Sequence, residues 1–478
     1  MLRRDGRARP RSIRMDGIRA PLLALAALTS AACSAPAPPP NVVMIVIDTL
    51  RADRLGSYGY SRPTSPNIDA LARESCLFEN AVSQSSWTGP SIASLFTSMY
   101  PSQHGMVDFK SSLGDALPTL AGVFRATGYT TLGVSANFTF ISPNKGFSRD
   151  FDTFEVLSRP PEPGEKAEIY GTNSVAGGEV TERVFSLLAE NRADPFFLYV
   201  HYMDPHSSYD PPAPFRDRFV ADYDGPIDGS TEQLQEIVRG ELEIGPADIE
   251  HLQSLYDAEV ATADAEVGRL LDHLRAIGAY EDSIVVLLSD HGEEFMDHGS
   301  LFHMFTLYRE QIHVPLILRK PGGLGGGTRV ASIIELVDVG PTVLELAGID
   351  DAREISGASH ARSMGPPVAA VSAEGDAALS ELHGDPLVTS VWRRKRHHAA
   401  MTTQGWTLLA GDRRDVLELY ESATDEQQQI DRSATERDVR ERLDGLLRAH
   451  PLTVWDERPD GDLSDEQRSG LRALGYSD

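Results

Sequence analysis

The chain has 478 residues, with 71 acidic side chains, 44 basic ones and a formal net charge of −27. This balance excludes a protein that binds nucleic acid by neutralising phosphates, and a hydrophobic content of 41% excludes global disorder. Two cysteines cannot form a disulfide framework. The length predicts one large domain with an appendage, or about two to three domains, in an acidic globular protein.

The first 32 residues differ sharply from the rest. They hold seven arginines and two aspartates, a charge of +5, whereas the remainder carries 37 basic and 69 acidic residues and stands at −32. A basic stretch, the apolar run 20–32 and small residues before Cys33 predict a signal peptide over residues 1–32. Residues 33–40 then form a proline-rich tether. We expect an exported protein of the periplasm or outer envelope, whose only membrane attachment is a lipid on Cys33, if that residue is lipidated.

Short apolar runs alternate with helical stretches in the main part of the chain. The runs predicted to be strands are 41–47, 130–134, 196–201, 284–289 and 314–318. The predicted helices are 71–74, 117–127, 178–191 and 250–277. Strands separated by helices predict an α/β fold with a doubly wound, mostly parallel sheet between helices. The turn-rich segment 160–173 is predicted to be a loop.

The C-terminal part is predicted to be a small separate layer. Residues 350–376 are poor in large apolar side chains, which favours a linker over 351–380 between a catalytic domain (41–350) and a C-terminal subdomain (381–478). Alternating apolar residues over 388–409 predict a small sheet, and helices are expected around 434–449 and 465–474.

Polar side chains follow three of the predicted strands. Asp48 follows the first, Asp204 and His206 follow the third, and Asp290 and His291 follow the fourth. Taken singly, an aspartate after a strand is usually a turn former and a histidine is usually structural. Ligands of open parallel sheets, however, bind at the carboxyl ends of the strands. Asp48, Asp290 and His291 together offer donors suited to Ca²⁺, Mg²⁺, Mn²⁺ or Zn²⁺.

Thr88 stands at the opening of a probable helix in the segment SSWTGPSIASLF. Pro90 is suited to the first helical turn, and the helix would direct free N–H groups toward the space beside Thr88. A hydroxyl there could attack an anionic ester if a metal lowered its pKa. The structural alternative is that Thr88 is a plain helix cap.

Seven segments in order carry a family resemblance. They include NVVMIVIDTLRADRLGSYGY, FFLYVHYMDPHSSYDPP, VVLLSDHGEEFMDHG and LYREQIHVPLILRKPG. On these motifs the chain resembles the sulfatase family of the alkaline phosphatase superfamily, in its bacterial secreted members. The resemblance implies an alkaline-phosphatase-like fold and a hydrolase acting on anionic esters.

The resemblance also implies roles for particular positions. Asp48, Asp290 and His291 correspond to metal ligands, and Thr88 stands at the nucleophile position, where it would complete the shell of one divalent ion. His206 corresponds to a histidine that contacts the anionic group. Substrate-binding residues are expected at Asn137 and Thr139, where many sulfatases carry Lys-x-His. His303 lies near the position of a substrate-contacting lysine, and either His206 or His303 is suited to protonate the leaving group.

Departures from the family pattern bear on the chemistry. Sulfatases read Cys (or Ser)-x-Pro-x-Arg at the nucleophile, whereas this chain reads Thr88-Gly-Pro-Ser-Ile92. Threonine cannot become formylglycine, so we expect no formylglycine. Without that aldehyde, a threonine ester is resolved more readily at phosphorus than at sulfur.

Several alternatives remain open. The chain is a phosphoric ester hydrolase or phosphotransferase, a sulfuric ester hydrolase working without formylglycine, or an inactive envelope binding protein. The expected substrate is a small-molecule, glycan-linked or lipid-linked anionic ester. A second metal ion would draw on Asp204, His206, His298 and His303.

Overall fold

The computed structural model describes residues 38–159, 175–364, 377–383, 399–411 and 417–450. The chain divides into two units, Met1–Pro38 and Pro39–Asp478, and all elements described below belong to the second. The predicted signal peptide, the loop 160–173 and the last helix, 465–474, lie outside the described residues.

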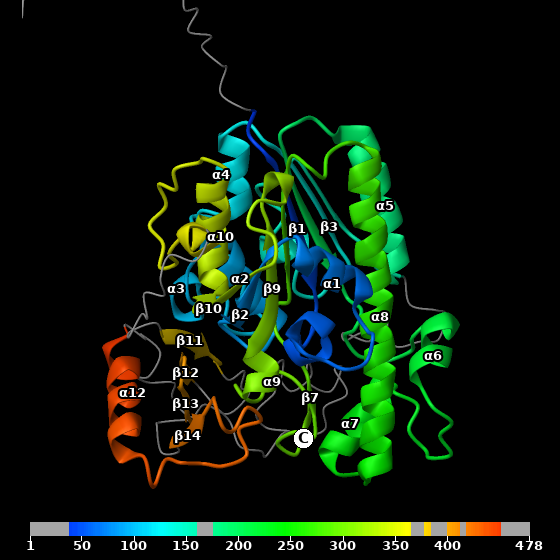
Figure 1. The fold of residues 1–478 in the computed structure, drawn as a ribbon, viewed down its shortest axis with the longest axis vertical. Helices are drawn as coiled ribbons and strands as arrows, with labels where there is room; N and C mark the ends of the chain where they lie inside the picture. The colour runs from blue at the N-terminus through cyan, green and yellow to red at the C-terminus, as the bar shows by residue number, and fades with distance from the viewer. Residues whose placement is uncertain (1–37, 160–174, 365–376, 384–398, 412–416, 451–478) are drawn as a thin grey trace, which may run out of the picture. The chain divides into compact units, whose positions relative to one another are not determined.

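The main unit is built on a mixed, mostly parallel sheet (Figure 1). Its eight described strands in spatial order are β10 (Thr328–Glu335), β2 (Cys76–Val82), β9 (His313–Arg319), β6 (Ser283–Leu288), β1 (Asn41–Ile47), β5 (Phe196–Tyr202), β3 (Thr130–Ser135) and β4 (Thr153–Val156). Every neighbouring pair is parallel except those of β9, which is antiparallel to β2 and β6. The chain enters β9 directly from a short helix that ends at Ile312, without a crossover that would return it to the other edge.

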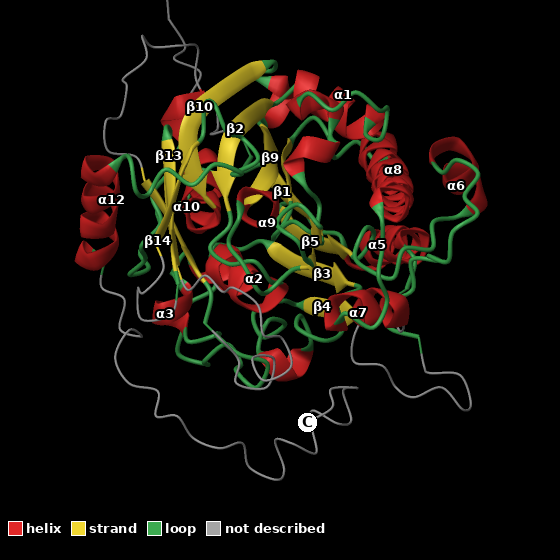
Figure 2. Cartoon of the chain, turned by 90° about the horizontal axis from the view of Figure 1, so that it is seen from below, coloured by secondary structure: helices red, strands yellow, loops and turns green. Residues whose placement is uncertain are grey.

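Helices cover both faces of this sheet, as Figure 2 shows end-on. The helices of the described chain are α1 (Pro66–Arg73), α2 (Thr88–Thr97), α3 (Pro101–His104), α4 (Leu120–Ala126), α5 (Gly177–Asn191), α6 (Ala213–Phe219), α7 (Thr231–Arg239), α8 (Pro246–Ala276), α9 (Arg309–Ile312), α10 (Leu336–Leu346) and α12 (Arg437–Ala449). Short 3-10 turns lie at η1 (Ala52–Arg54), η2 (Gly56–Tyr58), η3 (Pro143–Lys145), η4 (Pro321–Gly323) and η5 (Ala361–Met364).

The strand β1 shows why helices must cover both faces of the central sheet. All seven of its residues are buried, and its side chains alternate between two apolar clusters. Val42 and Met44 pack in the cluster that includes α2, α4 and α10. Val43 and Ile45 pack in the cluster that includes α1, α5 and α8. The predicted doubly wound, alkaline-phosphatase-like α/β architecture is therefore present.

The sequence pattern missed three strands of the sheet and the start of one helix. The strands β2, β4 and β10 were not predicted, and α1 begins at Pro66 rather than at residue 71. The amides of Asn67 and Ile68 are capped by the carboxylate of Asp264, at 3.0 and 2.8 Å, from the distant helix α8. This cap comes from a tertiary contact, so a local pattern does not contain it.

A four-stranded antiparallel sheet forms the C-terminal layer. Its strands are β11 (Ala377–Glu381), β12 (Ala399–Thr403), β13 (Trp406–Ala410) and β14 (Leu417–Glu421). It begins inside the segment that was predicted to be a linker, and Leu443 and Leu447 of α12 pack against it. Two-stranded pairing of β7 (Glu294–Phe295) with β8 (Leu301–Phe302) shapes the loop between β6 and α9. Among the described helices, none is both long and apolar enough to cross a membrane.

Candidate active site

Asp48 and Asp290 meet at the carboxyl edge of the central sheet. Asp48 directly follows β1 and Asp290 is the second residue after β6; because these strands are parallel neighbours, both residues lie at the same edge of the sheet. Both side chains are fully buried. The amide of Thr49 donates to Asp290 Oδ1 at 3.3 Å, and the amide of His291 donates to the same oxygen at 2.9 Å. The predicted pair of carboxylates is thus assembled and oriented by backbone amides.

Thr88 is the first residue of α2 and faces these carboxylates. Its Oγ1 lies 3.4 Å from Asp48 Oδ2 and 3.4 Å from His291 Nε2. The cap position of α2 is occupied by Trp87, whose backbone is extended, so the alternative of Thr88 as a plain helix cap is wrong. Thr88 is only 2% exposed, and its hydroxyl is directed toward the carboxylates. Thr88 therefore lies beside the carboxylates without capping α2, and its role as a nucleophile stays a prediction.

The tautomer of His291 exposes a lone pair to the two carboxylates. Its Nδ1 lies 2.9 Å from the carbonyl oxygen of Gly292, which can only accept, so Nδ1 carries the proton. Nε2 then faces Asp290 Oδ2 at 3.4 Å and Asp48 Oδ1 at 3.7 Å. Burial lowers the pKa of His291, which favours this neutral form. The lone pair of His291 Nε2 and the oxygens of Asp290 and Asp48 are all acceptors that point at one another, an arrangement that is stabilised only if a cation lies between them.

The carboxylate oxygens fit that requirement. Within the described part of the chain, Asp48 Oδ1 and Asp290 Oδ2 are buried and have no hydrogen-bond partner. Burial and the charge of Asp48 raise the pKa of Asp290. Burial alone would also raise the pKa of Asp48, but the hydrogen bond with His201 and the nearby histidine charges lower it below its ordinary value. Asp48, Asp290, His291 and Thr88 therefore fit a divalent cation, as expected from the sequence.

His201 belongs to the same cluster, although the sequence pattern did not point to it. It precedes the last residue of β5 and pairs in register with Val46 of β1. Its Nε2 lies 3.0 Å from Asp48 Oδ2, and ligand atoms of Asp48, His201 and Asp290 all lie within 4.8 Å of one another. The available signal was a single imidazole inside the otherwise apolar and aromatic run FFLYVHY, next to a strand that ends in an aspartate.

Asn137 reaches the cluster from the loop after β3. Its Nδ2 donates to Asp48 Oδ2 at 2.9 Å and lies 3.5 Å from Thr88 Oγ1. Its Oδ1 accepts from the amide of Phe140, which holds the side chain in this orientation. Thr139 is half-buried two residues further on, in the same turn. Asn137 thus lies beside Thr88, and its role toward substrate, like that of Thr139, stays a prediction.

Two further histidines line the side of the cluster next to His291. The ring of His303 lies 4.4 Å from the ring of His291, and the ring of His206 lies 5.2 Å from that of His303. Glu293, which was not predicted from the sequence, is fully buried, and its Oε1 is 3.1 Å from His303 Nδ1. Burial would raise the pKa of Glu293, but the charge of His303 and their hydrogen bond lower it below its ordinary value.

Of the residues considered for a second metal ion, His206 and His303 lie together, whereas His298 is held elsewhere. His298 binds Glu310 through Nδ1 at 2.8 Å, stacks on Tyr308 and reaches the carbonyl oxygen of Gln428 with Nε2 at 3.0 Å. His298 thereby joins the loop after β6 to the C-terminal layer. Since its two nitrogens are occupied there, it is not available beside His206 and His303, and the expectation of a second ion that uses it is wrong.

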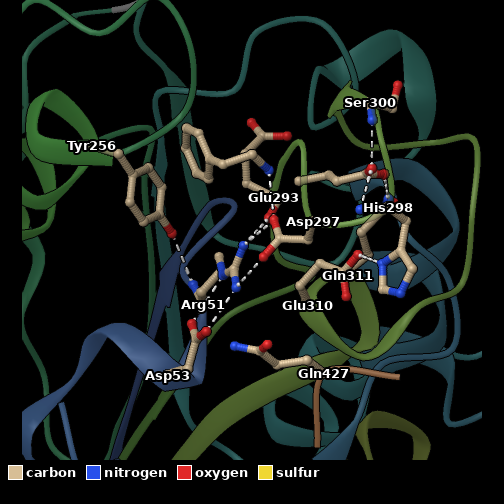
Figure 3. Close-up of polar contacts among 12 residues, drawn as sticks. Arg51, Asp53, Tyr256, Glu293, Asp297, His298, Ser300, Glu310, Gln311 and Gln427 are labelled. Atoms are coloured by element: carbon tan, nitrogen blue, oxygen red, sulfur yellow. Dashed lines mark hydrogen bonds and ion pairs between the residues drawn. The ribbon is translucent and has the colours of Figure 1, made fainter. Parts of the chain in front are cut away.

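Arg51 is a structural residue of this loop. Its guanidinium pairs with Asp53 at 2.7 Å and Asp297 at 2.9 Å and donates to the carbonyl oxygen of Glu293 at 3.0 Å (Figure 3). Its backbone amide donates to the hydroxyl of Tyr256 at 2.9 Å. The carboxylates neutralise the arginine, so it holds the loop 293–297 rather than an anionic ligand.

Comparison with known proteins identifies the class that this fold and site define. The sulfatase family profile matches residues 40–349, and the profile described as N-sulphoglucosamine sulphohydrolase, C-terminal, matches residues 297–449. The chain belongs to the sulfatase family, and it is a hydrolase acting on ester bonds.

Relatives and solved structures agree with this assignment. The chain is 26% identical over 419 residues to N-acetylglucosamine-6-O-sulfatase of Bacteroides thetaiotaomicron, covering 71% of this chain and 74% of that protein. It is 26% identical over 392 residues to the multifunctional alkaline phosphatase superfamily protein PehA of Trinickia caryophylli, covering 67% and 76%. The phosphonate monoester hydrolase of Agrobacterium radiobacter shares the fold with a TM-score of 0.67 at 21% identity, covering 86% of this chain and 95% of that one.

Proposed function

We propose that this chain is a metal-dependent hydrolase of anionic esters that uses Thr88 as its nucleophile and acts on phosphate esters in preference to sulfate esters. The carrying observation is the Thr88 hydroxyl, which faces Asp48 and His291 at 3.4 Å beside two unpartnered carboxylate oxygens. Asp48, Asp290, His291 and Thr88 would hold one divalent ion. When bound, such an ion supplies Lewis acidity, which favours the ionised hydroxyl and neutralises charge on the ester.

In the first step Thr88 Oγ1 forms a bond to phosphorus while the bond from phosphorus to the ester oxygen breaks. The hydroxyl proton passes to solvent, because Asp48 Oδ2, 3.4 Å away, already accepts hydrogen bonds from His201 and Asn137 and the pKa of Asp48 lies below its ordinary value. His206 or His303 gives a proton to the departing oxygen, so that an alcohol is released. Asn137 Nδ2 is placed to donate to an oxygen of the transferred group, because it lies 3.5 Å from Thr88 Oγ1.

In the second step water attacks phosphorus and the bond to Thr88 Oγ1 breaks. The histidine that lost a proton in the first step takes one from the water, and Thr88 regains its own proton from solvent. The net reaction consumes one ester and one water and releases an alcohol and phosphate. An alcohol in place of water would make the enzyme a transferase.

The threonine supports phosphoryl transfer over sulfuryl transfer. A hydrated formylglycine can release sulfate by returning to the aldehyde, and Thr88 has no equivalent route. A sulfuric ester hydrolase is the second candidate, because relatives at 26–27% identity bear the names N-acetylglucosamine-6-O-sulfatase and iduronate 2-sulfatase. These names also favour glycan-linked anionic esters as substrates. An inactive binding protein is disfavoured by the intact cluster.

The test is mass spectrometry of the peptide containing residue 88 after brief exposure to an aryl phosphate monoester, a diester and a sulfate ester. We expect a phosphate adduct on Thr88 and loss of turnover in Thr88→Ala. Thr97→Ala is the matched control, because Thr97 is a buried threonine on the same helix. Its hydroxyl donates to the carbonyl oxygen of Ala93 at 2.7 Å, within the helix itself. A sulfate adduct alone would favour the second candidate, and full activity in Thr88→Ala would refute the nucleophile.

We further propose that the chain is exported. The proposal is supported by the basic and apolar segment that precedes Cys33. Expression of the full-length chain in a Gram-negative host, followed by fractionation, tests export. Cys33→Ser separates a lipid anchor, which would be lost, from simple secretion, which would not.

A further inference from the structure

His201 is a buried imidazole that the proposed reaction does not use. It is fully buried between two polar partners, one on each ring nitrogen. Nε2 lies 3.0 Å from Asp48 Oδ2, and Nδ1 lies 2.9 Å from the hydroxyl oxygen of Tyr199 on the same strand. Tyr199 is itself fully buried, among Phe96, Phe151 and Phe154.

The partners of His201 determine its tautomer. The Asp48 carboxylate is ionised and can only accept, so Nε2 must carry the proton that it donates. In the neutral ring Nδ1 is then an acceptor, and it takes the hydroxyl hydrogen of Tyr199. A three-residue chain results, in which Tyr199 donates to His201 and His201 donates to Asp48.

This arrangement is the opposite of the one at His291. There the fixed acceptor is the carbonyl oxygen of Gly292 on Nδ1, which leaves the lone pair on Nε2 facing the carboxylates. Two histidines beside one carboxylate are therefore prepared for different tasks. His291 presents a lone pair for a cation, whereas His201 presents an N–H to the carboxylate itself.

The two oxygens of Asp48 are correspondingly divided. Oδ2 accepts hydrogen bonds from His201 Nε2 at 3.0 Å and from Asn137 Nδ2 at 2.9 Å, while Oδ1 has no hydrogen-bond partner among the described residues. A carboxylate held on one oxygen cannot rotate its other oxygen away, so the orientation is set before a cation arrives.

We propose that His201, with its tautomer set by Tyr199, is a positioning residue that aims Asp48 Oδ1 at the cation and thereby determines the metal affinity of the site. The inference rests on the metal site of the proposed function. Removal of such an orienting partner typically weakens metal binding by about 10- to 100-fold. Since Asn137 still holds Asp48 Oδ2, we expect the lower half of that range.

The test is Mn²⁺ titration of the metal-free full-length protein, with free Mn²⁺ followed by electron paramagnetic resonance. We expect about 10-fold weaker binding in His201→Ala. In His201→Gln, whose amide N–H can replace Nε2–H, binding should return to within about 3-fold of the wild type. In Tyr199→Phe the Mn²⁺ affinity should lie between those of the other two variants, because the ring of His201 can then adopt either tautomer. These two near-isosteric variants keep the test valid if His201→Ala does not fold.

His104→Ala is the matched control. His104 is also a buried histidine, bonded to Ser94 at 3.1 Å and to the amide of Met106, so its loss reports destabilisation without contact with Asp48. Unchanged Mn²⁺ affinity in His201→Ala would overturn the proposal. So would weak binding in His201→Gln together with an altered Co²⁺ absorption spectrum, because that result makes His201 a direct ligand.

Failure of this inference is separable from failure of the proposed function. Mn²⁺ affinity is measured without any ester, so an altered affinity in His201→Ala supports the positioning chain even if no adduct forms on Thr88. Conversely, an adduct on Thr88 with unchanged affinity in His201→Ala leaves the function standing and removes the role of His201.

Discussion

Glu335 offers a sharp test of how a buried acid couples the two layers of the protein. It lies at the end of β10, where Oε1 accepts from Leu379 N at 2.8 Å and Gln84 Nε2 at 3.1 Å. Oε2 lies 2.9 Å from the hydroxyl oxygen of Tyr100, from which it accepts when the carboxyl is ionised and to which it donates when the carboxyl is protonated. Because Leu379 belongs to β11, this carboxyl joins the central sheet to the C-terminal layer.

Burial and the nearby charge of Asp338 raise the pKa of Glu335 from 4.5 to about 8. Between these two values the folded protein holds a proton that the unfolded chain has released, so the folded state binds more protons. The free energy of unfolding therefore falls as the pH rises, by about 1.4 kcal/mol per pH unit. Over the window from 4.5 to 8 this contribution sums to about 5 kcal/mol at most.

The variant Glu335→Gln removes this titration while keeping an acceptor for Leu379 and Gln84 and a donor for Tyr100. Urea unfolding of both proteins should give similar stabilities near pH 5. As the pH rises to 8 the variant should become the more stable protein, by up to several kcal/mol. A stability difference that is independent of pH between 5 and 8 would refute the reasoning.

Three other outcomes follow from the structure. In Gly292→Ala the new Cβ would lie 2.0 Å from the carbonyl oxygen of Glu310, so α9 or the loop bearing His291 must shift, and Mn²⁺ binding should weaken at least about 10-fold. A divalent cation at about 100 times its Kd should stabilise the wild type by about 2.7 kcal/mol in urea unfolding but not Asp48→Asn, and equal stabilisation of both would contradict the site. Phe124→Ala should cost about 3 to 5 kcal/mol, since its buried ring stacks on Phe197 with ring centres 4.7 Å apart; a loss below about 1 kcal/mol would show that the core closes over the gap.

The fold class was readable from the sequence because a strand buried on both faces must be apolar throughout. The run NVVMIVI is such a strand, and its alternating side chains fill the two apolar clusters. The antiparallel direction of β9 was not readable, because HVPLILR is equally apolar in either direction. The start of α1 was missed because its amides are capped by Asp264 from a helix that lies far along the chain.

The candidate site, too, could be predicted from the sequence only in part. The residue types at the strand ends were sufficient to select Asp48, Asp290 and His291, and the resemblance placed Thr88, His206 and His303 near them. Arg51 and Arg54, which follow Asp48 closely in the chain, pair with carboxylates, Asp53 and Asp257 among them. The selection from strand ends was possible because β1, β5 and β6 are parallel, so that their carboxyl ends lie at one edge of the sheet.

Which hydrogen-bond partner each side chain of the site has was decided only by the tertiary structure. His201 and His291 are the same residue type on neighbouring parts of the sheet, yet one faces a tyrosine hydroxyl and the other a backbone carbonyl oxygen. Those partners come from the packing of the strands and the loop after β6, and they set which nitrogen carries the proton. The sequence by itself determined which chemical groups reach the site, whereas the packed structure determined which hydrogen-bond partner each of them has there, because those partners come from strands and loops that are distant in the chain.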